Sequence, residues 1–330
     1  MEAWFSLTEQ QRKGLFDQVS NRTGLPSVAI EKDWWVTLVL RVVFTLPVAD
    51  HLVFKGGTSL SKGWNLIDRF SEDIDLALDR NFLGFEGDLS KTQVKKLRKA
   101  SCGYISEEFL ELLVGRLEEI SIPDISLVVQ DINDSDVDPL VIEVRYRALT
   151  EPSAYLQPRV LIEIGSRSLR EPFEERSIQS FVGQQYRDRP FADDPFAVPT
   201  VLPKRTFLEK IFLLHEEFQK PLETIRVNRL SRHLYDLERL MDTEHGEEAL
   251  KDQGLYNSIV AHRQKFNVVR GIDYANHARD RVNFIPPAEI RKEWENDYRT
   301  MRESMIYGET KTFQQLIERL RELKKRLVYY

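Results

Sequence analysis

The stretch of sequence that decides the fold reads Lys55-Gly-Gly-Thr-Ser-Leu-Ser-Lys62 and resumes, after six intervening residues, as Arg69-Phe-Ser-Glu-Asp-Ile-Asp-Leu76. The apolar run Leu52–Lys55 predicts a short strand, and the diglycine predicts a turn into a helix that continues to Leu66. Residues 73–78 alternate polar and apolar side chains, which is typical of a strand. The stretch therefore predicts a strand, a tight turn into a helix, and a second strand.

The turn has the features of a phosphate site. A diglycine leaves backbone N–H groups able to face a ligand, and the N-terminus of the following helix attracts anions. Ser59 and Lys62 would add a hydroxyl group and a cation for phosphate oxygens. The stretch is not a Walker A loop, because the second glycine and the Ser or Thr after the lysine are absent. We therefore expect Gly56, Gly57, Ser59 and Lys62 to bind phosphates in a different loop.

Acidic side chains follow the turn at a spacing that suits a metal. Asp73 and Asp75 lie two residues apart on a predicted strand, so both carboxylates emerge from one face. Mg²⁺ is typically bound by one or two carboxylates together with substrate phosphates. Glu163 lies between Ile162 and Ile164 on a later predicted strand and becomes a third ligand if the two strands are neighbours. An Asp-x-Asp strand is often an ordinary exposed face, but its combination with the turn is more specific.

Composition limits the class of protein. The 330 residues are 42% hydrophobic and 30% charged, which suits about two folded domains. The net charge of −6 argues against non-specific coating of DNA but leaves room for a local basic groove. The sequence has no apolar run long enough for a membrane span and no secretory signal, and a single cysteine, Cys102, excludes an internal disulfide. We expect a cytoplasmic protein without a membrane partner.

Periodic patterns along the rest of the chain predict strands first and helices afterwards. Helices are expected within residues 1–50 and over 92–119, 206–218, 230–241 and 313–327, and strands over 125–130, 139–147 and 160–165. Thr206-x-x-Glu209 has the spacing of a capping box. The stretch 187–203, rich in Asp, Arg and Pro, marks a boundary. This order predicts an α+β domain over residues 1–195 and an all-helical C-terminal domain over residues 196–330.

Two of the predicted helices carry further candidates. Lys210 lies within or beside the apolar stripe of its helix, where an ammonium group needs a partner unless it reaches solvent. In the next helix Asp236 follows Arg229 by seven residues and His233 by three. Arg232 precedes Asp236 by four residues, the spacing of an ordinary helix ion pair. The spacing leaves a surface lysine and such a pair open as alternatives to a functional site.

The combination of motifs resembles the AbiEii/AbiGii-type nucleotidyltransferase toxins, which belong to the polymerase-β-like nucleotidyltransferase superfamily. Gly56–Leu60 and Arg69–Leu76 resemble the first motif of that family. Further similar stretches are Glu31–Trp35, Arg159–Gly165, Arg205–Lys210, Arg229–Leu237, and Asp297-Tyr298 with Met301 and Met305–Gly308. The resemblance covers most of residues 30–310.

The resemblance implies a polymerase-β-like mixed sheet with helices, and it implies roles for the candidate residues. The roles are triphosphate binding for Gly56, Gly57, Ser59, Lys62 and Lys210, binding of one or two Mg²⁺ for Asp73, Asp75 and Glu163, catalysis for Asp73, Asp75, Lys210 and Asp236, and RNA contact for Arg229, Arg232 and His233. Asp236 is expected to assist metal binding, to orient Lys210, or to act as a base toward an acceptor hydroxyl.

By the same resemblance, the protein is expected to be a toxin of a bacterial toxin–antitoxin or abortive-infection system. It would transfer NMP from an NTP to an RNA acceptor, most plausibly the 3′ end of tRNA. An antitoxin that silences it, often without a stable complex, would be its partner. The alternatives are a transferase acting on a protein or small molecule, a nucleotide-binding interaction module, and a γ-phosphotransferase acting on protein.

Overall fold

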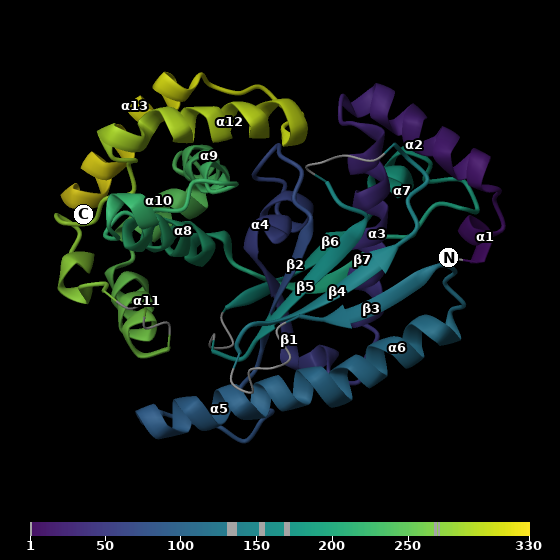
Figure 1. Ribbon diagram of the computed structural model, residues 1–330, viewed down its shortest axis with the longest axis horizontal. Helices are drawn as coiled ribbons and strands as arrows, with labels where there is room; N and C mark the ends of the chain where they lie inside the picture. The colour runs from purple at the N-terminus through teal and green to yellow at the C-terminus, as the bar shows by residue number, and fades with distance from the viewer. Residues whose placement is uncertain (1, 131–136, 152–155, 168–171, 267–268, 270) are drawn as a thin grey trace. The chain divides into compact units, whose positions relative to one another are not determined.

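The computed structural model describes residues 2–130, 137–151, 156–167, 172–266, 269 and 271–330 (Figure 1). The chain forms two compact units. The sheet unit consists of Met1–Trp64 and Phe70–Val201, and the helical unit consists of Asn65–Arg69 and Leu202–Tyr330. The short segment Asn65–Arg69 thus belongs to the helical unit although its neighbours on both sides belong to the sheet unit.

The bounds of the elements follow in chain order. The helices are α1 Glu2–Phe5, α2 Glu9–Thr23, α3 Ser27–Val43, α4 Gly56–Thr58, α5 Lys91–Tyr104, α6 Leu110–Glu119, α7 Phe181–Gln185, α8 Pro203–Glu217, α9 Ser231–Leu240, α10 Glu244–Lys251, α11 Gln253–Phe266, α12 Arg291–Met305 and α13 Phe313–Tyr329. Short helical turns are η1 Ala49–His51, η2 Ser59–Gly63, η3 Ile105–Phe109, η4 Leu222–Thr224, η5 Tyr274–His277 and η6 Ala288–Ile290. The strands are β1 Leu52–Lys55, β2 Asp73–Leu78, β3 Ile125–Val129, β4 Leu140–Tyr146, β5 Arg159–Gly165, β6 Phe173–Ile178 and β7 Phe196–Val201.

The sheet unit is built on one mixed seven-stranded sheet with the order β3-β4-β5-β2-β1-β7-β6. β2 is central and runs antiparallel to β1 and parallel to β5. On one face of β2 and β5, Ile74, Leu76, Val160, Ile162 and Ile164 are fully buried, whereas Asp73, Asp75 and Glu163 on the other face are partly exposed. This alternation follows from the two-residue period of a strand, and it places the acidic residues of both strands on one face.

Helix α3 is buried along nearly its whole length and packs against β2 and β5. A helix that is mostly apolar around its circumference is typical of a core. In the same helix, Trp34 stacks on Trp4 and Trp35 stacks on Tyr146. On another side of the sheet unit, α5, η3 and α6 follow one another as one long rod, which Figure 1 shows. The predicted charged helix over 92–119 is therefore confirmed, with a wider turn at η3.

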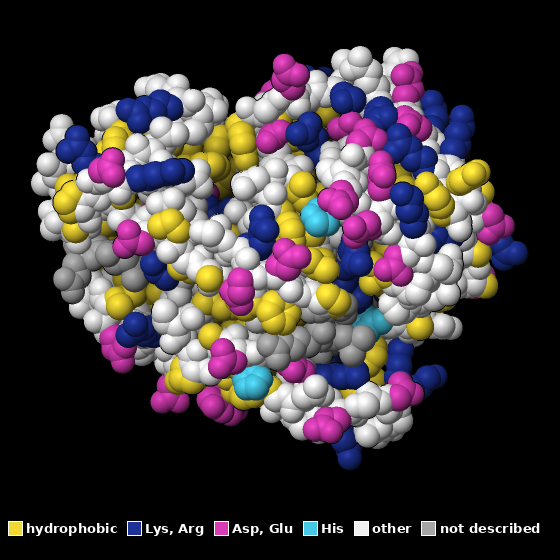
Figure 2. Space-filling model, turned by 180° about the vertical axis from the view of Figure 1, so that it is seen from behind, with side chains coloured by type: hydrophobic (Ala, Val, Ile, Leu, Met, Phe, Trp, Pro, Cys, Tyr) yellow, Lys and Arg dark blue, Asp and Glu magenta, His cyan; other side chains and the backbone are white. Residues whose placement is uncertain are grey.

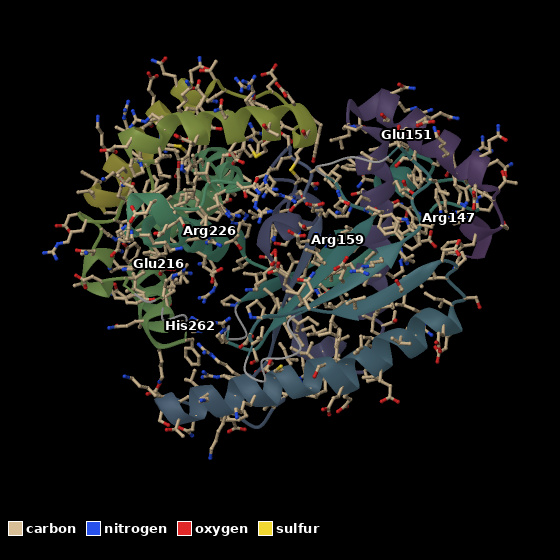
Figure 3. The ribbon with its side chains drawn as sticks, in the orientation of Figure 1. Arg147, Glu151, Arg159, Glu216, Arg226 and His262 are labelled. Carbon is tan, nitrogen blue, oxygen red and sulfur yellow. The ribbon has the colours of Figure 1, made fainter. Side chains whose placement is uncertain are left out.

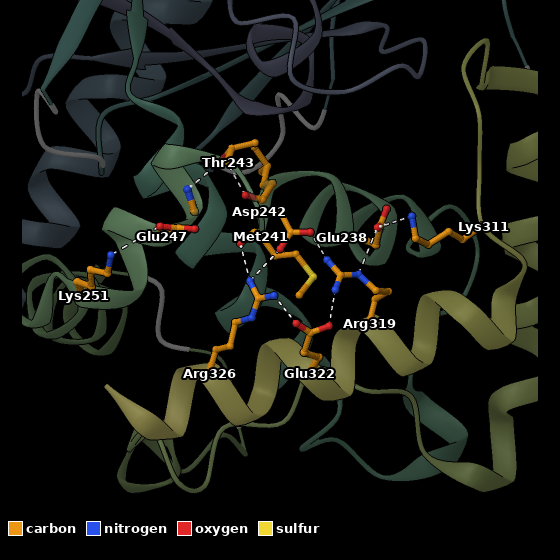
Figure 4. Close-up of polar contacts among 12 residues, drawn as sticks. Glu238, Met241, Asp242, Thr243, Glu247, Lys251, Lys311, Arg319, Glu322 and Arg326 are labelled. Atoms are coloured by element: carbon orange, nitrogen blue, oxygen red, sulfur yellow. Dashed lines mark hydrogen bonds and ion pairs between the residues drawn. The ribbon is translucent and has the colours of Figure 1, made fainter.

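The helical unit is organised around α9, which packs against α8, α12 and α13. Leu234, Leu237 and Leu240 of α9 are fully buried. At the end of α9, Asp242 binds both Arg319 and Arg326 of α13, and Glu322 binds the same two arginines (Figure 4). This network is largely exposed, so apolar packing is the main source of stability of α13.

The structure differs from the sequence prediction at several places. The predicted boundary after residue 195 falls before β7, which belongs to the sheet unit because it pairs with β1 and β6. The predicted capping box at Thr206 is wrong, since α8 already begins at Pro203, a residue suited to a first helical turn. The helix expected to reach Leu66 ends at Gly63. β6 was not predicted, since its charged sequence lacks the strand alternation.

In the described part of the chain, none of the helices has both the length and the apolar character needed to cross a membrane.

We predict that Leu320→Ala in α13 lowers the free energy of unfolding by about 2–5 kcal/mol, because its fully buried side chain would leave a cavity. The matched control is Leu222→Ala, since that leucine is 43% exposed and its truncation should change stability by less than about 0.5 kcal/mol. Urea unfolding of both variants measures the difference. Equal losses would contradict the packing described for α13.

Candidate functional site

The turn after β1 is shaped around a carboxylate. Gly56 has φ +78°, a left-handed conformation that glycine adopts without strain. A Cβ atom at this position would lie 1.9 Å from Oδ2 of Asp75. The Asp75 carboxylate therefore lies directly against the backbone at the start of α4. Only glycine permits this approach, which explains why the chain enters the helix through Gly56.

The first turn of this helix presents backbone donors. α4 begins at Gly56, and no side chain caps its N-terminus. The N–H groups at the start of a helix lack intrahelical acceptors and attract anions. Ser59 is fully buried and its hydroxyl donates to the Gly56 carbonyl at 2.9 Å. Ser59 therefore helps to shape the turn, while the N–H groups of Gly56 and Gly57 are backbone donors at the helix start.

Strand register aligns charged residues of three strands in one row. Asp75 of β2 is paired with Lys55 of β1 on one side and with Glu163 of β5 on the other. Residues paired across neighbouring strands project from the same face of a sheet. Asp73, two residues before Asp75, shares this face. The strands of Asp75 and Glu163 are therefore neighbours, which is the condition under which Glu163 was expected to be a third ligand, and Lys55 is a member of the row that the sequence prediction lacked.

The acidic row fits a metal that arrives with a nucleotide. Among the residues that the structure describes, no three His, Cys, Asp or Glu side chains converge closely enough to form a metal centre by themselves. Glu163 is thus a neighbour of Asp75 in register, and its role as a third metal ligand stays a prediction. Asp73 and Asp75 still supply the two carboxylates that Mg²⁺ typically combines with substrate phosphates.

Helix α3 holds both parts of this site through buried ion pairs. Lys32 binds Glu72, the residue before Asp73, and donates to the Gln157 carbonyl at 3.0 Å. A hydroxyl contact adds to this anchoring, because Thr58 Oγ1 donates to the Asp73 carbonyl at 2.5 Å. The segment that leads into the acidic pair is therefore fixed from two sides.

The second ion pair of α3 involves Lys62. Asp33 accepts from Lys62 at 2.5 Å and from the Phe181 N–H at 2.8 Å. Burial raises the pKa of Asp33, and the Lys62 cation and the hydrogen bonds oppose this shift. The Lys62 ammonium therefore anchors the end of η2 to α3. Lys62 thus has a buried carboxylate partner in the structure, and its contact with phosphate stays a prediction.

A second cluster lies within the helical unit. Lys210 of α8 is buried and its ammonium group lies 2.8 Å from Oδ2 of Asp236 in α9. Arg69 donates to both oxygens of Asp236, each at 2.7 Å. Burial alone would raise the pKa of Asp236, but the two cations outweigh burial and lower it. Because both oxygens are engaged and fully buried, the geometry favours orientation of Lys210 among the three roles considered for Asp236.

The predicted RNA contacts have other surroundings in the structure. His233 is buried with Nδ1 3.4 Å from the Lys210 ammonium, and burial, with that cation next, lowers its pKa well below 6.5. His233 thus lies within the Lys210 cluster, and its contact with RNA stays a prediction. The backbone of Arg229 has φ +63° and donates to Asp297 at 2.7 Å, which fixes the start of α9. Arg226, labelled in Figure 3, binds Glu217.

The sequence prediction assigned no role to the residues that hold these clusters, namely Arg69, Lys32, Asp33 and Glu72. One signal was available for α3, because Glu31-Lys-Asp33 is a charged triplet in an otherwise apolar helix. Charges in such a helix require buried partners. The identity of those partners depends on tertiary contacts between residues far apart in the sequence.

Comparison with known proteins identifies the family of this chain. The family model described as nucleotidyl transferase AbiEii toxin of a type IV toxin–antitoxin system matches residues 39–319. The chain belongs to this family. It is accordingly a nucleotidyltransferase, and the predicted class, an α+β fold with a mixed sheet and a helical C-terminal part, is confirmed. No curated protein matches this chain with significant similarity. The matched range of residues spans both units.

We predict that Gly56→Ala abolishes transfer, because the added Cβ would displace the Asp75 carboxylate. Gly84→Ala is the matched control, since Gly84 has φ +79° but a Cβ added there would have no other atom within 4 Å. Both variants should lose about 1–2 kcal/mol of stability from left-handed strain, and Gly56→Ala should lose more. Activity per folded molecule, measured with thermal unfolding, separates the two effects. Retained activity in Gly56→Ala would contradict the proposed contact.

We predict that Lys32→Met destabilises the protein by about 3–5 kcal/mol, because it leaves the buried Glu72 carboxylate without its cation. Lys32→Met/Glu72→Gln should recover much of this loss by removing the remaining charge. Lys13→Met is the control, since the Lys13–Asp17 pair is exposed, and its melting temperature should match that of the unchanged protein. Equal effects of both lysine variants would argue against the anchoring role.

Proposed function

We propose that this member of the AbiEii family transfers NMP from an NTP to the 3′ end of an RNA, with tRNA as the acceptor and Mg²⁺ as the metal. The observation that carries the proposal is the contact between the Asp75 carboxylate and the Gly56 backbone. It joins an anion-attracting helix start and an acidic strand in one site. A bound metal–triphosphate has these two requirements, namely donors for phosphates and carboxylates for the metal.

In this proposal each group of residues has one task. The backbone at Gly56 and Gly57 holds phosphate oxygens, and Asp73 and Asp75 hold Mg²⁺, which neutralises charge on the phosphates. Lys210, oriented by Asp236, contacts phosphate oxygens of the nucleotide. The acceptor hydroxyl oxygen forms a bond to the α-phosphorus, the bond from that phosphorus to pyrophosphate breaks, and the hydroxyl proton passes to solvent. Pyrophosphate is the second product.

Surface charge supports a local RNA contact and not an extended one. On the face seen in Figure 2, basic and acidic side chains are interspersed. The negative net charge likewise argues against binding along a length of nucleic acid. A free RNA end in a small site requires few phosphate contacts. We propose that Arg229 and Arg232 make these phosphate contacts. An antitoxin is the proposed regulatory partner.

We predict that the Asp73→Ala/Asp75→Ala variant transfers no label while its free energy of unfolding stays within about 1 kcal/mol of the unchanged protein, because partly exposed strand carboxylates contribute little to folding. The assay incubates each protein with total tRNA, Mg²⁺ and each α-³²P-labelled NTP in turn. Label on RNA, present for the unchanged protein and absent for the variant and after EDTA, is the expected result.

Parallel reactions with γ-³²P-labelled NTP decide between the alternatives. Release of labelled pyrophosphate indicates nucleotidyl transfer, and label on a protein indicates γ-phosphoryl transfer. Nucleotide binding without either product would support an interaction module. An active double variant would overturn the assignment of Asp73 and Asp75 to the metal.

A further inference from the structure

Arg69 has an unusual position for a residue of the nucleotide motif. It ends the segment Asn65–Arg69, which belongs to the helical unit, while Asp73, four positions later in the sequence, belongs to the sheet unit. The segment is fixed by the backbone contacts of Asp68 with Tyr307 and of Arg69 with Ile306. The same short stretch of chain thus contains the acidic pair and an arginine that belongs to the helical unit.

The contact between Arg69 and Asp236 is bidentate and buried. Arg69 is 1% exposed, and its Nε and Nη2 atoms each lie 2.7 Å from one oxygen of Asp236. A planar guanidinium fixes a carboxylate in two directions at once, which the point charge of a lysine does not do. The plane and position of the Asp236 carboxylate therefore depend on Arg69.

Lys210 in turn depends on that carboxylate. Burial lowers the pKa of Lys210, Asp236 raises it, and Arg69 and Arg232 lower it. His233 also faces the ammonium, with Nδ1 at 3.4 Å. Asp236 is thus the group that favours the charged form of Lys210, and its salt bridge to the ammonium spans 2.8 Å.

We propose that Arg69 is a positioning residue of the transferase: it fixes Asp236, and Asp236 orients the Lys210 ammonium toward the nucleotide. This inference rests on the proposed function, in which Lys210 contacts phosphate oxygens. Arg69 itself contacts neither substrate nor metal in this scheme. Its effect on catalysis passes through the buried carboxylate.

A double-mutant cycle tests the inference. Arg69→Gln should lower kcat by about 10- to 100-fold, since small displacements of a catalytic group cost this much. Asp236→Asn should also lower kcat, and the Arg69→Gln/Asp236→Asn variant should be no worse than Asp236→Asn within about twofold, because both changes interrupt one path. Arg69→Lys keeps the charge but loses the bidentate geometry of the guanidinium, so it should recover only part of kcat. If Arg69→Gln fails to fold, Arg69→Lys and the uncharged double variant carry the comparison.

The matched control is Arg239→Gln. Arg239 of α9 binds Asp68 of the same segment at 2.7 Å, but this pair is partly exposed and has no contact with Asp236 among the interactions described above. Its kcat should equal that of the unchanged enzyme. Nucleotide affinity, measured by titration calorimetry on folded protein, should fall less than kcat does in Arg69→Gln, because the backbone at Gly56 and the acidic pair remain intact. A merely structural role would lower the melting temperature and leave kcat per folded molecule unchanged.

The outcomes separate the two proposals. If the unchanged enzyme transfers no label from any NTP, the proposed function fails, and this inference falls with it. If the unchanged enzyme is active and folded Arg69→Gln retains its kcat within about twofold, only the role of Arg69 is overturned. Losses that multiply in the double variant would show that Arg69 acts independently of Asp236, which also overturns the inference.

Discussion

The candidate site of the sheet unit depends on two charged residues that α3 carries into the core. Lys32 holds Glu72 next to the acidic pair, and Asp33 holds Lys62 at the end of the helical turn that begins at Gly56. Burying these charges costs free energy that hydrophobic side chains of similar size would not cost. The pairs fix the position of the nucleotide motif, since each binds one half of that motif to helix α3. The close approach of Asp75 to Gly56 requires both halves to be fixed.

The helical unit uses the same principle around Asp236. A fully buried carboxylate lies between Arg69 and Lys210, and its own oxygens are occupied by those cations. A group in this state is unsuited to accept a proton or to bind a metal, but it is suited to hold an ammonium in one place. Each unit thus contains a buried ionic anchor beside the residue proposed to act on the nucleotide. In the helical unit one partner of that anchor, Arg69, comes from the nucleotide motif itself.

Membership of the AbiEii family gives this arrangement a biological setting, since the family comprises nucleotidyl transferase toxins of type IV toxin–antitoxin systems. The two anchors of α3 and the Asp236 cluster are buried, whereas the turn at Gly56 is half-buried and the Asp242 carboxylate that binds the arginines of α13 is exposed.

The sequence by itself determined the local elements and the chemistry they carry. The diglycine turn, the alternating strand with Asp73 and Asp75, the helical periodicity of the C-terminal part and the family resemblance all follow from short-range patterns, because turn conformation and periodicity depend on neighbouring residues. Only the tertiary structure decided the partners. The pairing of Asp75 with Glu163, the use of Lys62 by Asp33, and the sharing of Asp236 by Arg69 and Lys210 join residues far apart in the chain. A lysine or aspartate reads the same in sequence whether it faces a ligand or a buried counter-charge, and packing alone distinguishes the two.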